Sequence, residues 1–265
     1  MHAFNYHRPA SSKDAVSLSS KNAEGRYLAG GQSLVQAMKL RLSSPTDLID
    51  LGTIKDLAGI KVSGSTVEIG AMTRHADVAA SAEVKKAIPA LAALAAMIGD
   101  RQVRHMGTIG GSLANNDPAA DYPAAALGLG ATITTNKRKI EADKYFKGLF
   151  ETALEAGELI TSVSFPVPKR AAYMKFKNPA SRFAIVGVFV ADFSGKVRVG
   201  VTGAGPSAFR QADMEKALSA KFAPESVANM KVKADGLNND LHASPEYRAH
   251  LVTVMAKRAV EAALK

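Results

Sequence analysis

The amino-acid sequence predicts an α+β fold, and three observations support this prediction. In "STVEIGAMT" the apolar residues alternate, as in a half-buried strand. Further on, "AAYMKF", "AIVGVFVADF" and "KVRVGVTGAG" follow one another like three strands of an antiparallel meander, with a tight turn at 193–195. The later segment "SPEYRAHLVTVMAKRAVEAAL" predicts a long helix with Ser244 as its N-cap and Pro245 in its first turn. Strands and helices therefore do not alternate regularly along the chain, which is typical of an α+β fold.

The N-terminal elements surround a pair of glycines. A short apolar run at Tyr27–Ala29 leads into Gly30 and Gly31, and helical spacing then links Leu34, Met38 and Leu42. A strand, a glycine turn and a helix are predicted here. "TDLIDL" predicts the next strand, and Thr73 is expected to cap a short helix that follows "STVEIGAM".

The middle of the chain predicts one helix and one long loop. "EVKKAIPALAALAAMIG" is predicted as a single helix that contains Pro89 and stops at Gly99. Residues 100–123 show no sustained periodicity and are predicted as a functional or mobile loop. "ELITSVSFPVP" predicts a strand ended by its prolines. We therefore expect two domains, residues 1–170 and 171–265.

Composition narrows the classes of function. The chain has 265 residues, 47% of them hydrophobic, which suffices for a large core. It has no apolar run of about eighteen residues and no secretory signal, so we expect a cytoplasmic protein, with peripheral attachment at the inner face of the membrane left open. The absence of cysteine excludes a disulfide, a thiol nucleophile and a thiolate-held cluster within this chain. A redox centre here must be an organic cofactor.

The charge and the histidines give little support to several other classes. The net charge is +10, but the basic residues are scattered without aromatic interleaving, so nucleic-acid binding is not expected. No zinc or hydrolase motif is present, and His75 and His105 are interpreted as structural or surface residues. We predict no metal site and no catalytic residue.

Two glycine loops are candidates for binding a diphosphate. The helix predicted after Gly30 and Gly31 begins with free N–H groups, which attract anions when the backbone can approach closely. A second pair, Gly110 and Gly111, follows Thr108 in "GTIGGSLANNDPAAD", where Asp121 could accept hydrogen bonds from a ribose or an adenine. Neither loop matches the Rossmann or Walker pattern, and each alone is also consistent with an ordinary turn. A third cluster, "VTGAGPSAFR", is interpreted as a turn.

Taken together, the motifs resemble a known family. "YLAGGQSL", "PTDLIDLGTI", "IGAMTRHADV", "IGDRQVRHMGTIGGSLANNDPAADYPAAALGLGAT", "NPASRFAIVGV" and "ADGLNNDLHASPEYRAHLVTVMAKRA" are similar, in this order, to the FAD-binding medium subunit of molybdenum hydroxylases. This group includes carbon monoxide dehydrogenase-type enzymes and is similar to the flavin domain of xanthine dehydrogenase. The resemblance implies a PCMH-type flavin module of two α+β subdomains, shared with vanillyl-alcohol oxidase. A C-terminal domain with a three-stranded antiparallel sheet and helices would follow.

The resemblance also implies a set of FAD-binding residues. Both glycine loops would embrace the diphosphate through backbone N–H groups, and Asp121 would hold the adenosine end. Ile98 and Gly99 match a segment that approaches the cofactor, and Ile160 and Lys175 match positions near the adenine and the flavin ring. The full set is Ala29, Gly30, Gly31, Gln32, Ser33, Leu34, Ile98, Gly99, Thr108, Ile109, Gly110, Gly111, Asp121, Ile160 and Lys175.

The implied activity is electron transfer within an oxidoreductase complex. The expected partners are a large subunit with molybdenum bound to a pterin and a small subunit with two-iron two-sulfur clusters, assembled as a dimer of heterotrimers. The FAD of this chain would receive electrons from the small subunit and pass them to an external acceptor. Two alternatives stay open: a free-standing FAD-dependent oxidoreductase and a nucleotide-binding module without enzymatic activity. The cysteine-held four-iron cluster of some relatives is excluded.

Overall fold

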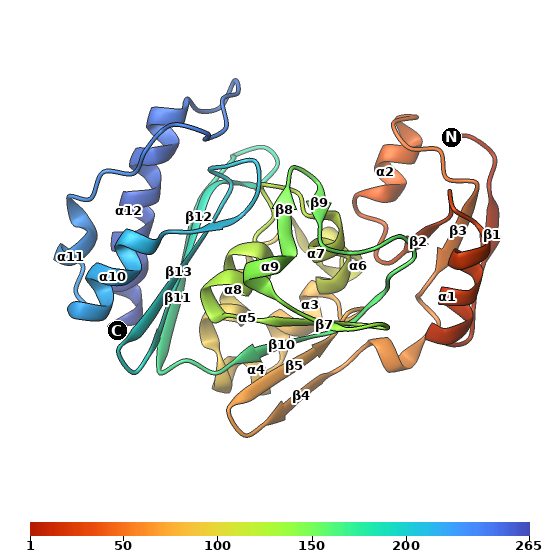
Figure 1. Ribbon diagram of the computed structural model, residues 1–265, viewed down its shortest axis with the longest axis horizontal. Helices are drawn as coiled ribbons and strands as arrows, with labels where there is room; N and C mark the ends of the chain where they lie inside the picture. The colour runs from red at the N-terminus through yellow and green to blue at the C-terminus, as the bar shows by residue number, and fades with distance from the viewer.

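A computed structural model describes residues 1–265 as three blocks arranged side by side (Figure 1). The N-terminal block, at the right of Figure 1, contains a parallel sheet in the order β1-β3-β2. The predicted strands at 27–29 and 46–51 are both present in it. Its elements are β1 (Asn5–His7), α1 (Ser12–Lys21), β2 (Arg26–Leu28), α2 (Leu34–Lys39) and β3 (Asp47–Asp50), followed by the 3-10 helix η1 (Lys55–Leu57).

The central block is an antiparallel five-stranded sheet, in the order β4-β5-β10-β6-β7, packed against short helices. The alternation predicted for β5 is confirmed, because Val67 and Ile69 are fully buried. The strands are β4 (Ile60–Ser63), β5 (Thr66–Gly70), β6 (Thr132–Thr135), β7 (Lys139–Glu141) and β10 (Ile160–Pro166), and the two-stranded hairpin of β8 (Phe146–Gly148) and β9 (Glu151–Thr152) lies beside them. The helices are α3 (His75–Ala80), α4 (Ala82–Ala87), α5 (Pro89–Ala96), α6 (Arg101–Met106), α7 (Ile109–Asn115), α8 (Tyr122–Leu129) and α9 (Ala142–Tyr145).

The single helix predicted across Pro89 is wrong. The structure has two helices, α4 and α5, with Ile88 between them in a non-helical conformation (φ −138°, ψ 74°). A proline disfavours the helical conformation of the residue before it, whereas its own fixed φ suits the first position of a new helix. Gly99 has a φ of +49° but lies beyond the end of α5, which is capped by Met97.

The long loop predicted at residues 100–123 is also wrong. The segment forms α6, α7 and the start of α8, and two of these helices have a side-chain N-cap. Asp100 accepts a hydrogen bond from the N–H of Val103, and Thr108 accepts one from the N–H of Gly111. Caps of this kind stabilise helices too short to show an apolar period. The expected capping role of Thr73 is not observed, because its hydroxyl group bonds to the backbone of Gly59 and Arg74 precedes α3.

The C-terminal block is an antiparallel sheet in the order β11-β12-β13-β14, flanked by helices. The predicted meander and its turn at 193–195 are confirmed, and the last helix begins after Ser244 as expected. The sheet has a fourth, two-residue strand that the sequence did not predict. The elements are β11 (Arg170–Lys177), β12 (Ala184–Phe193), β13 (Lys196–Thr202), β14 (Phe209–Arg210), α10 (Ala212–Ala220), α11 (Glu225–Ala228) and α12 (Pro245–Ala263). None of the helices in the chain combines the length and the hydrophobicity needed to span a bilayer.

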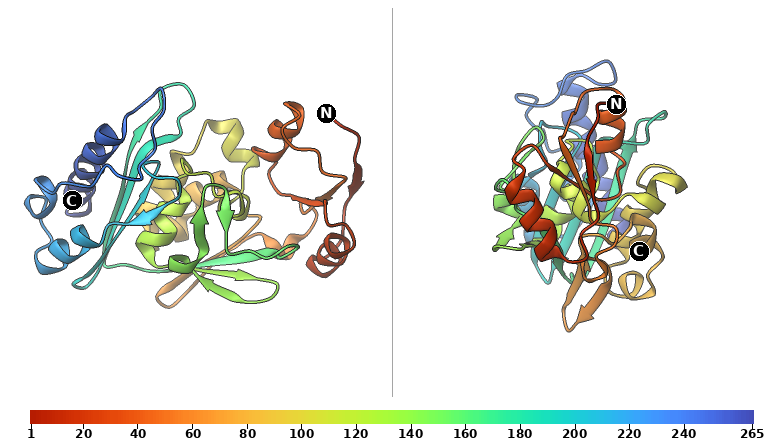
Figure 2. Two further views of the ribbon diagram at one scale, coloured as in Figure 1. Left: turned by 45° about the horizontal axis from the view of Figure 1, so that its top comes forward. Right: turned by 90° about the vertical axis from the view of Figure 1, so that its right-hand side faces the viewer.

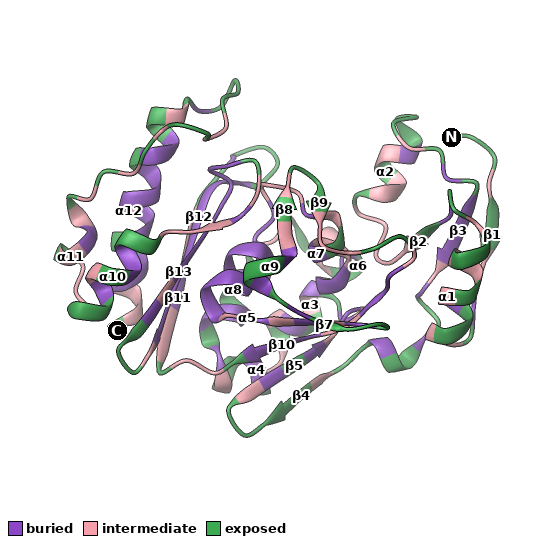
Figure 3. Cartoon of the chain, viewed as in Figure 1, coloured by how far each residue is buried: buried purple, intermediate pink, exposed green.

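Helices cover both faces of the C-terminal sheet. Helices α10 and α12 pack on one face, and α8 of the central block packs on the other (Figure 2). All residues of α8 are buried, as Figure 3 shows. At the crossing, Arg198 of β13 donates to the Leu127 carbonyl oxygen at 2.8 Å and to Asp143 at 2.6 Å. The C-terminal and central blocks are therefore joined by a packed interface.

This interface depends on the small size of Gly200 in β13. A Cβ atom there would overlap the carbonyl oxygen of Ala124 in α8, and neither backbone can move without disturbing its own element. We predict that Gly200→Ala lowers the free energy of unfolding by about 3 kcal/mol in urea denaturation. Gly205→Ala is the control, because its Cβ would come no closer than 3.3 Å to any atom, the nearest being in the ring of Phe209, and would stay 3.4 Å from the Ser207 carbonyl oxygen. Equal effects of the two substitutions would contradict the close-packing explanation.

Candidate functional site

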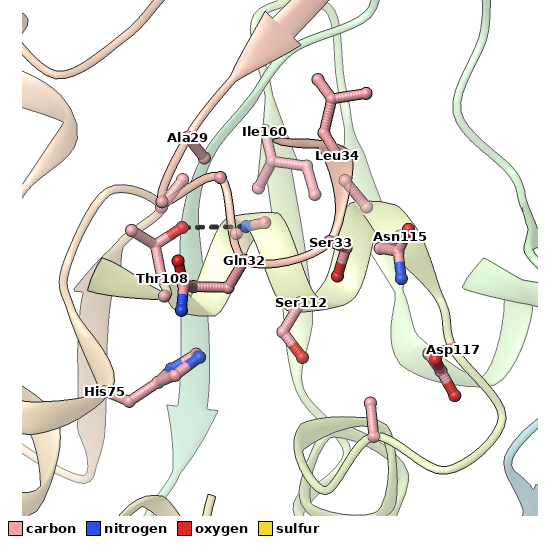
Figure 4. A pocket seen from close by; sticks show the side chains of 18 of the residues that line it. Ala29, Gln32, Ser33, Leu34, His75, Thr108, Ser112, Asn115, Asp117 and Ile160 are labelled. Carbon is pink, nitrogen blue, oxygen red and sulfur yellow. Dashed lines mark hydrogen bonds between the residues drawn. The ribbon is translucent and has the colours of Figure 1, made fainter. Parts of the chain in front are cut away.

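A cavity of about 530 Å³ lies where the three blocks meet, and both glycine loops line it (Figure 4). The loop of residues 29–34 comes from the N-terminal block, the start of α7 from the central block, and residues 181–183 from the C-terminal block. Such a volume suits a cofactor-sized ligand. Among the residues proposed from the sequence, those that line the cavity are Ala29, Gly30, Gly31, Gln32, Ser33, Leu34, Ile98, Gly99, Thr108, Gly110, Gly111, Asp121 and Ile160.

The two glycine loops are in direct contact. A Cβ atom on Gly30 would overlap the carbonyl oxygen of Met106 and would lie 2.7 Å from the Cα atom of Gly107, so only glycine fits there. On the opposite side, a Cβ atom on Gly111 would lie 3.3 Å from that of Ala29. The absence of side chains at these positions lets the backbones of the two loops approach each other along the cavity.

The first loop offers free hydrogen-bond donors. The backbone N–H groups from Ala29 to Leu34 donate to no group of the protein, although these residues border the cavity. Gly31 has a φ of +71°, a conformation that favours glycine, and Ser33 makes no capping hydrogen bond to α2. Uncompensated N–H groups at the start of a helix form an anion-binding site. The loop is therefore suited to a phosphate or diphosphate.

The second loop was expected to offer its backbone N–H groups to a ligand, but two of them bond to the protein instead. The N–H of Ile109 donates to the Thr73 carbonyl oxygen at 3.1 Å, and that of Gly110 donates to the Ala71 carbonyl oxygen at 2.8 Å. Ile109 is fully buried and does not line the cavity, so its predicted contact with a ligand is corrected to a structural role. A Cβ atom on Gly110 would lie 2.5 Å from the Cβ of Ala71, so this glycine is required by protein packing.

Thr108 and Ser112 give the second loop its polar groups facing the cavity. The Thr108 Oγ1 atom accepts from the N–H of Gly111 at 3.1 Å, as the dashed line in Figure 4 shows, and its own proton remains available. Ser112 lines the cavity one residue further along α7. A ligand between the loops would therefore meet backbone donors on one side and hydroxyl groups on the other.

Asp121 and Lys175 form a buried ion pair instead of presenting two free groups. A carboxylate oxygen of Asp121 lies 2.9 Å from the Nζ atom of Lys175, and the Tyr173 hydroxyl group donates to Asp121 at 2.6 Å. Lys175 also donates to the Met97 carbonyl oxygen at 3.2 Å and does not itself line the cavity. Burial raises the pKa of Asp121, whereas the ammonium group of Lys175 and the hydroxyl group of Tyr173 oppose that shift. The two predicted residues therefore bind each other, and only Asp121 lines the cavity.

The cavity lining combines a cationic group with apolar side chains. Arg182 donates to the Gly99 carbonyl oxygen at 3.3 Å. The segment 150–160 contributes four apolar residues to the lining, namely Phe150, Leu154, Leu159 and Ile160. Glu158 also lies there, but its side chain is enclosed and accepts from Arg138 at 3.0 Å, which holds the pKa of its carboxyl group at about 2.

Sequence reasoning missed the position of His75. Its imidazole is buried, lines the cavity and lies 5.4 Å from the ring of Tyr122. The Nδ1 atom has no hydrogen-bond partner, contrary to the expectation of a hydrogen-bonded or surface histidine. Burial, assisted by the charge of Arg104, lowers the pKa of His75 to about 4, so the ring is neutral at pH 7. A single histidine outside any motif carries no sequence pattern that would place it here.

The chain is similar to known proteins in both sequence and structure. A family model described as the FAD binding domain in molybdopterin dehydrogenase matches residues 2–168. The carbon monoxide dehydrogenase medium chain of Afipia carboxidovorans is 36% identical, over 98% of this chain and 96% of its own length. The nicotine 6-hydroxylase medium subunit of Paenarthrobacter nicotinovorans is 35% identical over 97% and 96%. A solved carbon monoxide dehydrogenase from Hydrogenophaga pseudoflava superimposes with a TM-score of 0.91 at 35% identity, over 99% of this chain and 98% of that one.

The buried neutral His75 predicts a specific dependence of stability on pH. Because the folded pKa of about 4 is below the ordinary value of 6.5, the unfolded chain binds a proton first as the pH falls. The neutral His75 therefore contributes fully to the free energy of unfolding above about pH 6.5. This contribution, about 3 kcal/mol, is lost as the pH falls toward 4. In urea denaturation, His75→Gln should show a smaller loss of stability than the wild type between these pH values. His105→Gln, on the exposed side of α6, should follow the wild type. Parallel curves for all three proteins would contradict the assignment.

Proposed function

The chain belongs to the family of FAD-binding domains of molybdopterin dehydrogenases, and from this premise we propose that its cavity binds FAD between the two glycine loops. The observation that carries the proposal is the run of unbonded N–H groups from Ala29 to Leu34, opposite the hydroxyl groups of Thr108 and Ser112. A dinucleotide needs donors for its diphosphate and apolar surface for its two ring systems. The cavity lining contains both.

The residues present fit each part of FAD. The loop of residues 29–34 would hold the diphosphate, with the Thr108 hydroxyl group on the opposite side. Arg26 and Arg182 line the cavity as cations. Of the three carboxylates that line it, Asp121 and Glu158 are compensated by Lys175 and Arg138, whereas Asp117 accepts only from the N–H of Ala119. The lining thus keeps an excess of one positive charge, which supports binding of an anionic ligand.

FAD supplies the redox chemistry, accepting and releasing electrons singly or in pairs, and the chain supplies its binding and environment. The donors of residues 29–34 orient the molecule along the cavity. Arg182 lines the cavity without an ion-pair partner, whereas Asp121 and Lys175 neutralise each other. His75 is neutral at pH 7 and adds no charge. No group of this chain is required as a general acid or base.

We further propose the assembly in which the chain works. Its partners would be a molybdenum-pterin large subunit and an iron-sulfur small subunit, arranged as a dimer of heterotrimers in the cytoplasm. Electrons would enter from the small subunit and leave to an external acceptor. The names of the relatives, medium chain and medium subunit, support a multi-subunit complex. We also propose residue 170, where β11 begins, as the boundary between the flavin module and a C-terminal domain of residues 171–265.

A free-standing FAD-dependent oxidoreductase is less well supported. Such an enzyme needs a substrate pocket over the flavin, but the C-terminal block here consists of one sheet whose faces are covered by its own helices and by α8. The long helix α12 packs on β11 and β12, on the face of the sheet opposite to α8 (Figures 1 and 2).

Filling the cavity should abolish FAD binding without unfolding the chain. Ser112 lies on α7 with its side chain in the cavity, so Ser112→Phe should place a ring where the cofactor binds. We predict at least a roughly hundredfold weaker FAD affinity by flavin fluorescence titration, with an unchanged circular dichroism spectrum. Ser17→Phe, on the exposed face of α1, is the control. Normal FAD binding by the Ser112 variant would refute this location of the site.

The assembly is tested by production together with the products of neighbouring genes. We expect a purified complex that contains molybdenum, iron and FAD, with substrate-dependent reduction of an added dye. The Ser112→Phe complex should retain molybdenum and iron but lose flavin and most dye reduction. An isolated chain that oxidises an organic substrate at full rate would instead support the free-standing enzyme.

A further inference from the structure

We propose that Asp117, in the turn between α7 and α8, accepts hydrogen bonds from sugar hydroxyl groups of bound FAD. This inference rests on the proposed function, and it gives a ligand role to the one carboxylate of the cavity lining that has no cation as partner. The ribose of the adenosine and the ribityl chain of the flavin both carry such hydroxyl groups, one on each side of the diphosphate. The two sources have the same chemistry, and the ligands used in the test separate them.

Asp117 continues a row of polar side chains along α7. Thr108, Ser112 and Asn115 are spaced by four and three residues, so they share the face of the helix that borders the cavity. Figure 4 shows Ser112, Asn115 and Asp117 following one another away from Thr108. From Thr108 to Asn115 the row spans roughly 10 Å. A phosphate held near the start of α7 would therefore place the adjoining sugar along this row, toward Asp117.

The backbone on both sides of Asp117 is fixed. Before it, the fully buried side chain of Asn116 donates to two backbone carbonyl oxygens of the β8–β9 hairpin, at 3.0 and 2.7 Å. After it, the carbonyl oxygen of Pro118 accepts from the N–H of Gly203, at the end of β13, at 2.7 Å. A carboxylate held between two blocks in this way loses little conformational freedom when a ligand binds.

One carboxylate oxygen of Asp117 has no partner in the chain. The Oδ1 atom accepts from the N–H of Ala119 at 2.8 Å, whereas no group of the protein donates to Oδ2. Burial raises the pKa of Asp117, and the hydrogen bond from Ala119 opposes that shift. A negative charge at this place also repels a diphosphate. The carboxylate is therefore unfavourable unless the ligand brings donors to it, and hydroxyl groups are the donors that FAD carries next to its diphosphate.

The test substitutes Asp117→Asn, which keeps an acceptor for Ala119 but replaces the free oxygen by an amide donor. We expect this variant to bind FAD about tenfold more weakly in fluorescence titrations of the full-length chain, alone and in the co-produced complex. Charge alone predicts the opposite, because the loss of a negative charge favours an anionic ligand. Inorganic pyrophosphate should accordingly bind at least as tightly as to the wild type. Asp56→Asn, the same change on an exposed side chain of η1, should leave both affinities unchanged.

Ligands that lack hydroxyl groups locate the contact. If the ribose is the source, the wild type should bind 2′-deoxy-ADP or 3′-deoxy-ADP about tenfold more weakly than ADP, and Asp117→Asn should bind all three alike. If the ribityl chain is the source, the preference of the wild type for riboflavin over lumiflavin, which lacks that chain, should shrink about tenfold in Asp117→Asn. The comparison of the three ADP ligands on the wild type does not depend on how well a variant folds.

The outcomes separate this inference from the proposed function. Unchanged FAD affinity in Asp117→Asn, an equal loss of pyrophosphate affinity, or losses that are the same for ligands with and without hydroxyl groups would overturn the inference and leave the proposed function intact. A wild-type chain that binds neither FAD nor ADP, alone or in the complex, would overturn both.

Discussion

The contact between two backbones at Gly30 is the constraint on which the site depends. The carbonyl oxygen of Met106 occupies the place where any other residue would carry its β-carbon. Because the chain passes so close at this point, the loop of residues 29–34 faces the start of α7, and the cavity lies between them. Each loop then serves a different purpose. The first keeps its N–H groups unbonded, whereas the second directs those of Ile109 and Gly110 into the central block.

Much of the fold follows from local patterns in the sequence, and the errors arise where short-range chemistry outweighs periodicity. Alternation at Val67 and Ile69 predicted β5, and the meander and α12 were predicted because they are long and clearly bounded. The segment before Gly99 was misjudged because apolar spacing continued across Pro89, although Ile88 could not stay helical before it. Residues 100–123 were misjudged because their helices are stabilised by Asp100 and Thr108 as caps and by burial, neither of which leaves a period.

The outline of the site was also predictable from local patterns in the sequence. The glycines and their neighbours lie next to each other along the chain, so a motif could place most of them in the cavity lining. Their individual roles depend on partners distant in sequence: Ala71 for Gly110, Thr73 for Ile109, and Lys175 for Asp121. His75 has no motif at all, and its depressed pKa results from burial that only the folded chain creates. Residue types can suggest a diphosphate site, but the use of each N–H group requires the tertiary structure.

The ion pair between Asp121 and Lys175 bears on how such modules can be recombined. The family model ends at residue 168, whereas the cation that compensates Asp121 comes from β11, beyond that limit. A flavin module grafted at this limit onto a foreign C-terminal unit would bury a carboxylate without its counter-charge, and α8 would lose the sheet that covers it. A working chimera must therefore carry β11, or a host strand that presents a lysine at the same register.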